Sequence, residues 1–401
     1  MDYNLPRRPF LLLVLCILTY ICSGTISMLM SVYLPDVVRD MLGRADEATM
    51  SRVGPYLNAA YLAGMTVGGL AIGMLSDRFG RVKMLAISAA ACGVFTVAAA
   101  GAHDWVWVVV LRAMAGVGVS GVLLSCAVLV SERWPADSRA VAQGVLGVAF
   151  PVGIVLSGGL NVLLSDWREA FLIGFAPVAV ALLVLFLLKE TAIQVREKAD
   201  ESPLKSLFRP PNRQKLIVGS IVYGFDLVGL WAIFSWMPTW VDSLIGGGEE
   251  AGQMRGTTMM ILGMGGMLGT GISGFLVNKM GVRRTLLSNF AGTLMVCALL
   301  FVSNQSFSPL VLVETAVLAL FFGISQGALT VYVTELFPTE VRATGTGFCF
   351  NIGRVFTTSA VFFVGALVTV LGGYANAMLV FSGAFVVAWT ALYFDKHTRP
   401  D

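Results

Sequence analysis

The chain has 401 residues, of which 57% are hydrophobic and 13% are charged, and its formal net charge is +3. The charged share is about half of that in a soluble domain, which excludes a soluble globular protein and indicates a polytopic membrane protein. The small net charge argues against a nucleic acid as partner. We expect a monomer embedded in a lipid bilayer.

Cysteine and histidine usage narrows the chemistry further. The six cysteines all fall inside apolar segments, where they are predicted to be packing residues rather than disulfides or metal ligands. His103 and His397 lie outside these segments, which argues against a His-ligated metal or a catalytic triad. No Gly-x-x-x-x-Gly-Lys-Ser/Thr loop occurs, so ATP is disfavoured as an energy source. The sequence predicts no metal, no cofactor and no enzymatic activity.

Twelve apolar segments of about 20 residues predict twelve membrane-spanning helices, and hence an all-α membrane protein. The first follows Arg7 and Arg8, but it is too long for a signal peptide and is interpreted as an uncleaved span. The predicted spans are 10–37, 53–75, 84–101, 105–131, 140–164, 169–188, 216–245, 252–277, 285–303, 308–334, 343–371 and 374–394.

The segment 189–215 contains seven basic and four acidic residues and is the one stretch typical of a linker. It divides the chain into an N-terminal six-helix half, 1–188, and a C-terminal six-helix half, 216–401. Most of the 27 Lys and Arg residues fall in cytoplasmic segments if both termini are cytoplasmic. We therefore expect an inner-membrane protein with both ends of the chain in the cytoplasm.

Two internal repeats indicate that the halves arose by duplication. The hairpin sequence Gly73–Lys83, Gly-Met-Leu-Ser-Asp-Arg-Phe-Gly-Arg-Val-Lys, has a near copy at Gly274–Arg284. The corner sequence Glu132–Arg139 has a counterpart at Glu335–Arg342, and in each corner a proline ends the preceding helix.

The first hairpin resembles the loop between helices 2 and 3 of the major facilitator superfamily. The residues that carry this resemblance are Gly73, Leu75, Asp77, Arg78, Gly80, Arg81 and Lys83. Val331–Gly347 is similar to the loop between helices 10 and 11 of the sugar, niacin-type and organic-ion transporters of that superfamily. The resemblance extends over essentially the whole chain. It implies the major facilitator fold, with two pseudo-repeat halves that transport by alternating access.

In that family the helix 2–3 loop latches the cytoplasmic side against helix 11, which implies the same role for Asp77. The second copy has Asn278 in place of the aspartate and Val282 in place of Arg81. The resemblance therefore implies a weaker second latch. The four corner residues Glu132, Arg139, Glu335 and Arg342 have two interpretations. They form either a helix-turn-helix corner without chemistry, or an inner ion-pair network that breaks when the protein opens inward.

Four ionisable residues lie well inside predicted spans: Arg112, Asp226, Glu314 and Arg354. Each is costly in the membrane unless it is paired or hydrated, and each is therefore a candidate functional residue, with a static pair between helices as the alternative. Arg112 and Glu314 lie about seven residues in from the outer ends of their spans, roughly 10 Å deep. Their opposite charges predict an outer gate in which the two approach when the outside closes.

Asp226 and Arg354 fall near the midplane, the depth at which transporters of this architecture bind substrate. Organic-anion members of the resembled family carry a cation in helix 11, which implies that Arg354 binds a carboxylate of the substrate. An arginine can do so through two parallel hydrogen bonds. We predict that Asp226 carries a proton, with Glu314 as the next candidate.

Further polar and aromatic residues are candidates for the substrate site. Asn351 lies one helical turn before Arg354. Trp231, Tyr20 and Gln326 are plausible liners, with core packing as the alternative for each. The sequence also predicts two residues of the outer aromatic belt at the membrane interface, Trp236 and Trp240. Glycines inside the spans predict tight helix crossings.

These features predict a secondary transporter that moves a small organic anion by proton symport. The alternative is a proton-driven drug or metabolite efflux antiporter, whose helix 5 motif is only loosely matched by Gly147–Gly159. A third class is a membrane receptor of the same fold that does not transport. A monocarboxylate, an aromatic acid and an acidic sugar would all satisfy a buried arginine, so the substrate stays open.

Overall fold

The computed structural model describes residues 9–190, 206–210, 212–338 and 341–395. Regular structure within these ranges is entirely helical. The chain divides into two compact units. Unit 1 comprises Met1–Ala45 and Tyr56–Gln194, and unit 2 comprises Asp46–Pro55 and Val195–Asp401. The predicted linker 189–215 lies largely outside the described residues.

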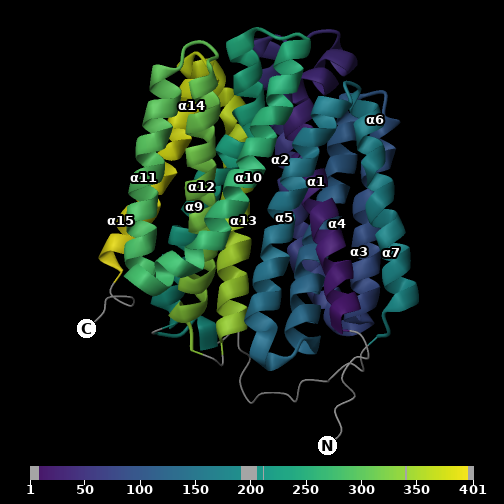
Figure 1. The fold of residues 1–401 in the computed structure, drawn as a ribbon, viewed down its shortest axis with the longest axis vertical. Helices are drawn as coiled ribbons and strands as arrows, with labels where there is room; N and C mark the ends of the chain where they lie inside the picture. Colours follow the sequence, from purple (N-terminus) through teal and green to yellow (C-terminus); the bar gives the residue numbers. More distant parts are fainter. Residues whose placement is uncertain (1–8, 191–205, 211, 339–340, 396–401) are drawn as a thin grey trace, which may run out of the picture. The chain divides into compact units, whose positions relative to one another are not determined.

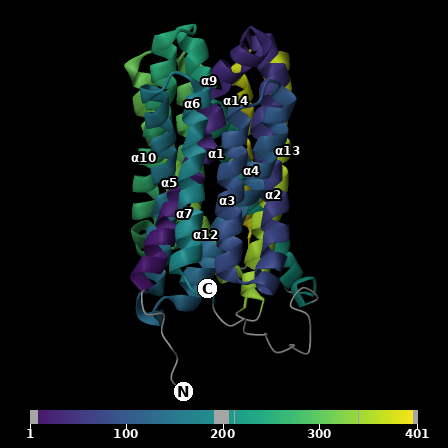
Figure 2. The ribbon, with the colours of Figure 1, turned by 90° about the vertical axis from the view of Figure 1, so that its right-hand side faces the viewer.

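Unit 1 is a bundle of long helices that run side by side along one direction (Figures 1 and 2). Its sixth span is interrupted by a short 3₁₀ turn at Leu172–Gly174. The helices are α1 (Pro9–Leu42), α2 (Glu47–Phe79), α3 (Arg81–Ala100), α4 (Trp105–Arg133), α5 (Arg139–Leu163), α6 (Trp167–Phe171) and α7 (Phe175–Leu187).

Unit 2 repeats this plan, and its last span is broken at Gly383. The first residues of α2 also belong to this unit, because Thr369 donates to the Ser51 hydroxyl at 3.1 Å. The helices are α9 (Asn212–Ile245), α10 (Glu249–Met280), α11 (Val282–Ser303), α12 (Pro309–Leu336), α13 (Arg342–Leu371), α14 (Tyr374–Ser382) and α15 (Ala384–Phe394).

Eleven segments of the described chain are long and apolar enough to cross a membrane. Trp167–Leu187 and Tyr374–Phe394 each count as one segment despite their interruptions. The twelfth predicted span is α2, whose glycines and polar residues such as Asn58 make its 33 residues less apolar. The predicted all-α membrane fold is confirmed. Both α1 and α2 extend a turn or more beyond their predicted spans, because helical hydrogen bonding continues past the apolar stretch.

Glycines form close helix crossings, as the sequence predicted, and one such crossing repeats between the units. In unit 1, α1 crosses α5 so closely that a Cβ on Gly24 would clash with the carbonyl oxygen of Phe150, beside Gly153. In unit 2, α9 crosses α13, and a Cβ on Gly224 would lie 3.3 Å from the Cα of Gly353. Gly24 and Gly224, like Gly153 and Gly353, are 200 positions apart. The same close crossing is therefore built twice.

Each of the two charged hairpins, Gly73–Lys83 and Gly274–Arg284, turns at a glycine with a positive φ angle, Gly80 at 100° and Gly281 at 81°. The carboxylate of Glu190 lies over Gly80 and accepts hydrogen bonds from the backbone N–H groups of Val82 at 3.1 Å and Lys83 at 3.0 Å. A Cβ on Gly80 would lie 2.5 Å from that carboxyl group. Glycine is therefore required both for the turn and for this cap on the N-terminus of α3.

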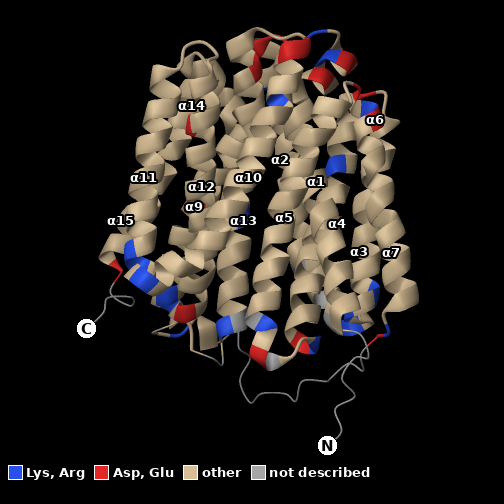
Figure 3. Ribbon diagram, viewed as in Figure 1, with Lys and Arg blue, Asp and Glu red and all other residues tan. Residues whose placement is uncertain are grey.

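Charged residues are concentrated at the helix ends (Figure 3). In each unit, Lys and Arg gather at the end where the first helix of that unit begins, α1 in unit 1 and α9 in unit 2. Few charges lie along the middle of the helices. This distribution is that of a multi-pass membrane protein.

The prediction that Trp236 and Trp240 form an interface belt is wrong. Trp236 is 0% exposed and stacks on Tyr374 with ring centroids 5.7 Å apart. Trp240 is 2% exposed and packs edge-on against Phe301 at 5.1 Å. Their helix, α9, is buried on most of its surface inside unit 2, so these rings have no lipid interface to occupy.

Candidate transport site

Asp226 is a fully buried carboxylate of unit 2. It lies on α9, two residues after the glycine crossing, and its side chain is 0% exposed. The Gln326 side-chain N–H on α12 donates to Asp226 Oδ2 at 2.8 Å. Asp226 Oδ1 has no hydrogen-bond partner among the described residues. A buried polar atom without a hydrogen-bond partner is costly, which makes Oδ1 of Asp226 a candidate site for a proton.

Arg354 is the second ionisable residue predicted for the midplane of unit 2. It is half-buried on α13, directly after Gly353 of the glycine crossing. Tyr223, on α9, lies close enough to interact electrostatically with both Asp226 and Arg354. The Tyr223 ring is itself held edge-on against Phe350 of α13 at 4.3 Å. The crossing of α9 and α13 therefore brings an acid, a base and a phenol into one region of unit 2.

The other predicted liners have these positions. Asn351 donates to the carbonyl oxygen of Gly347 at 2.8 Å, and its own Oδ1 has no partner in the described part of the chain. Trp231 is half-buried on α9. Tyr20 belongs to unit 1, where its hydroxyl donates to the carbonyl oxygen of Leu123 on α4 at 2.9 Å. The roles of these residues in binding stay predictions.

Arg112 is the buried cation of unit 1. Its side chain is 1% exposed on α4, and its Nη1 donates to the carbonyl oxygen of Ile26 at 2.9 Å. Its Nη2 reaches the carbonyl oxygen of Ser27 at 3.5 Å. The guanidinium also lies over the Tyr61 ring, 4.5 Å from the centroid. These contacts are all within unit 1.

Glu314, the predicted gate partner of Arg112, is half-buried on α12. Its Oε2 accepts a hydrogen bond of 2.6 Å from the side-chain amide of Asn304, which follows α11. This amide also donates to the carbonyl oxygen of Leu300 at 2.9 Å. The pairing of Arg112 with Glu314 stays a prediction.

The hairpin Gly73–Lys83 makes local polar contacts. Arg81 forms an ion pair with Glu132 at 3.5 Å in unit 1 and donates to Ser76 at 3.3 Å. Arg78 lies over the Phe79 ring at 5.5 Å. The side chain of Asp77 lies outside the described part of the structure.

The two corners repeat one contact. Arg139 donates to the carbonyl oxygen of Trp134 at 3.2 Å, and Arg342 donates to that of Phe337 at 3.2 Å. Each arginine thereby closes the turn before its helix. Glu335 is exposed. Whether these residues also form a network that breaks during transport stays a prediction.

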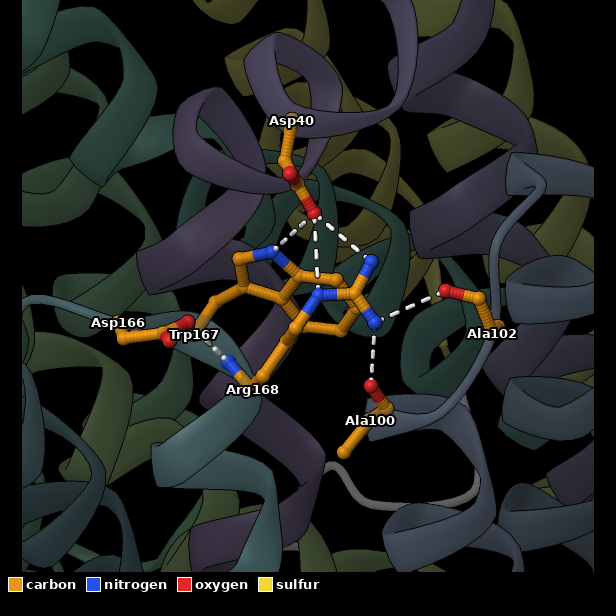
Figure 4. Close-up of polar contacts among 6 residues, drawn as sticks. All are labelled: Asp40, Ala100, Ala102, Asp166, Trp167 and Arg168. Carbon is orange, nitrogen blue, oxygen red and sulfur yellow. Dashed lines mark hydrogen bonds and ion pairs between the residues drawn. The ribbon is translucent and has the colours of Figure 1, made fainter.

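Two charged clusters were missed from the sequence. In unit 1, Asp40 Oδ2 accepts hydrogen bonds from Trp167 Nε1 at 3.1 Å and from Arg168 Nη2 at 2.9 Å (Figure 4). In unit 2, Arg255 pairs with Asp242 at 2.9 Å while largely buried. All four charged residues lie within three residues of an end of a predicted span. Their depth therefore gave no signal, and only the fold brings them together.

The fold defines a class of protein: a polytopic helical membrane protein with ionisable side chains buried inside its spans. A sequence model of the Major Facilitator Superfamily matches residues 12–360. The chain belongs to this superfamily, and it is therefore a membrane transporter rather than an enzyme.

Relatives and solved structures agree with this assignment. The chain is 30% identical to the cis,cis-muconate transport protein of Acinetobacter baylyi, over 86% of each chain. It is 28% identical to the 3-(3-hydroxy-phenyl)propionate transporter of Escherichia coli, over 84% of this chain and 83% of that one. The crystal structure of a D-xylose-proton symporter matches with a TM-score of 0.79 over 97% of both chains at 17% identity, which shows the shared fold.

Proposed function

We propose that the chain is a secondary active transporter that carries a small organic anion together with a proton across a bacterial inner membrane. Both named relatives carry carboxylic acids with unsaturated or aromatic carbon skeletons. We extend that substrate class to this chain. The observation that carries the proposal is the buried Asp226, with its unpartnered Oδ1, in the same region as Arg354.

The arrangement couples the proton to the anion through charge. In the empty site, ionised Asp226 and Arg354 balance each other electrostatically. Protonation of Asp226 at Oδ1 removes that balance and leaves the guanidinium of Arg354 to hold the carboxylate of the substrate. A proton and an anion then bind together with no uncompensated charge, which the low dielectric of the bundle favours. Alternating access carries both to the other side.

We further propose that the protein works as a monomer with both termini in the cytoplasm. The concentration of Lys and Arg at the end where each unit begins supports this orientation (Figure 3). At that end, the latch would involve Asp77 together with Arg78, Arg81 and the two corner sequences. The ion pair between Arg81 and Glu132 supports a role for the first hairpin in holding the inner side of unit 1.

Counterflow in proteoliposomes tests this function. Vesicles are loaded with one compound and diluted into a trace of the same compound in labelled form. The compounds are cis,cis-muconate, 3-(3-hydroxyphenyl)propionate, a neutral sugar and an organic amine. We expect exchange of the carboxylic acids only. Exchange of the amine instead would indicate a drug efflux protein, and binding without exchange would indicate a receptor.

Arg354→Lys tests the assigned anion ligand in the same assay. An ammonium group keeps the positive charge but cannot form two parallel hydrogen bonds to one carboxylate. We expect the apparent affinity for the acid to fall about tenfold or more. The matched control is Arg213→Lys, an exposed position at the start of α9, with unchanged affinity. Wild-type affinity in Arg354→Lys would assign the anion to another residue.

A further inference from the structure

The guanidinium of Arg112 in unit 1 is buried with most of its donors unused. It has five N–H groups, and the structure assigns two of them to the carbonyl oxygens of Ile26 and Ser27. The second of these contacts is long, at 3.5 Å. Nε has no hydrogen-bond partner among the described residues. No carboxylate in the described part of the chain pairs with Arg112, although its side chain is 1% exposed.

Arg168 in the same unit shows how an arginine is normally satisfied. Although it is 30% exposed, it donates through Nε and Nη2 to Asp40 at 3.2 and 2.9 Å. Its Nη1 donates to the carbonyl oxygens of Ala102, at 2.9 Å, and Ala100 (Figure 4). The exposed arginine thus has a counter-charge and the buried one has none. Burial of an uncompensated charge is costly, so Arg112 requires another explanation.

The free donors of Arg112 have the geometry of a carboxylate site. Nε–H and the adjacent Nη2 form the side-on fork of a guanidinium, which holds a carboxylate through two parallel hydrogen bonds. One prong of this fork is unpartnered, and the other makes only the 3.5 Å contact. The stronger contact, to Ile26, uses Nη1 and leaves the fork open.

The surroundings hold this fork in place. The Tyr61 hydroxyl donates to the Ser27 hydroxyl at 2.5 Å, because Ser27 itself donates to the carbonyl oxygen of Ser23 at 2.6 Å. These hydroxyls are therefore occupied, and the Tyr61 ring lies against the guanidinium. Helices α1, α2 and α4 thus fix the cation before any ligand arrives, which lowers the entropic cost of binding.

We propose that the side-on fork of Arg112 is an anion subsite of unit 1 that binds a carboxylate group of the transported acid. This inference rests on the proposed function. The fork is sealed from solvent in the present conformation. A transporter passes through states that open its interior, and the anion reaches Arg112 in one of them. Bound there, the carboxylate supplies the counter-charge that no described carboxylate supplies in the present conformation.

Binding and thermal unfolding of the purified full chain test the proposal. The probes are cis,cis-muconate and 3-(3-hydroxyphenyl)propionate, titrated in a zwitterionic buffer that contains neither chloride nor any other carboxylate. We expect Arg112→Lys to bind the acid about tenfold or more weakly, and Arg112→Gln to lose binding. Without acid, Arg112→Gln should unfold at or above the wild-type temperature, because an uncompensated buried charge has been removed. A merely structural arginine would give a lower unfolding temperature. The matched control is Arg168→Lys, which should keep wild-type affinity.

Several outcomes would overturn the inference. Wild-type affinity in Arg112→Gln would do so while leaving the proposed function intact, since the wild-type protein would still bind the acids. If both Arg112 variants unfold at a lower temperature than the wild type without acid, and bind the acid with unchanged affinity, then Arg112 has a structural role only. Chloride is tested separately. If chloride raises the unfolding temperature of the wild type, competes with the acid and has no effect on the Arg112 variants, the subsite binds an inorganic anion. Failure of the wild type to bind any acid would refute the proposed function and this inference together.

Discussion

The two units use one backbone plan with different charges at its centre. Two residues after the first glycine of the crossing, unit 1 has Ile26 and unit 2 has Asp226. One residue after the second glycine, unit 1 has Ile154 and unit 2 has Arg354. The crossing is set by backbone contact and is retained in both. The charged residues beside it are free to differ, and they confine the proposed proton site to unit 2.

Unit 1 obtains its buried charge from another helix. Arg112 projects from α4 onto the carbonyl oxygen of Ile26, the residue at the position equivalent to Asp226. Its own equivalent in unit 2 is Glu314 on α12, which is half-buried and held by Asn304. The halves thus carry opposite charges at matching places. The close helix crossing is thus retained in both halves, while the charges of the buried residues differ.

The largest expected effect comes from reversing these matched charges. Arg112→Glu and Glu314→Arg should each prevent closure of the outer side, because each places like charges opposite one another. We expect periplasmic labelling of a cysteine placed below the gate to rise about tenfold. The double variant should restore closure but not binding of the acid, since the fork of Arg112 would no longer be in its place. If labelling of the double variant is as high as that of the single variants, the two residues do not form a gate.

A smaller effect is expected at the inner hairpins, where the first copy has Asp77 and the second has Asn278. Asp77→Asn makes the copies alike. A carboxylate at a helix N-terminus contributes about 0.3–1 kcal/mol, so the outward-facing population should fall by up to about fivefold. Cysteine accessibility from the periplasmic side should decrease while the unfolding temperature stays close to that of the wild type. Unchanged accessibility would remove Asp77 from the latch.

Much of this architecture follows from composition and repeats. Long apolar segments, the hairpin at Gly73–Lys83 and its copy, and glycines inside the spans each indicate a local feature of the chain. They predicted the helices, the duplication and the close crossings. Several helix ends lie beyond the predicted spans, most clearly in α1, α2 and α9, since an apolar stretch ends before its helix does.

Contacts between distant helices could not be predicted in the same way. Asp226 and Gln326 were both candidates, but their hydrogen bond joins residues 100 positions apart. It depends on the rotation of α9 and α12 about their axes, and α9 is too uniformly apolar to indicate which face is buried. The same ambiguity explains the error at Trp236 and Trp240, because the sequence indicates their position along α9 but not the direction in which their rings point.

The central claim is that Asp226 couples a proton to the transport of an organic anion. It is tested most directly by following external pH and labelled acid together in lightly buffered proteoliposomes. The wild type should take up protons with the acid and accumulate it when the outside is acidic. Asp226→Asn keeps the shape and an acceptor for Gln326 but cannot ionise. It should still exchange labelled acid in counterflow, without proton uptake and without accumulation.

The matched control is Asp166→Asn, because asparagine caps a helix as well as the exposed aspartate that begins α6. It should behave as the wild type in both signals. Proton uptake and accumulation at the wild-type level in Asp226→Asn would contradict the account. The proton would then be carried by another residue, with Glu314 as the first to be tested.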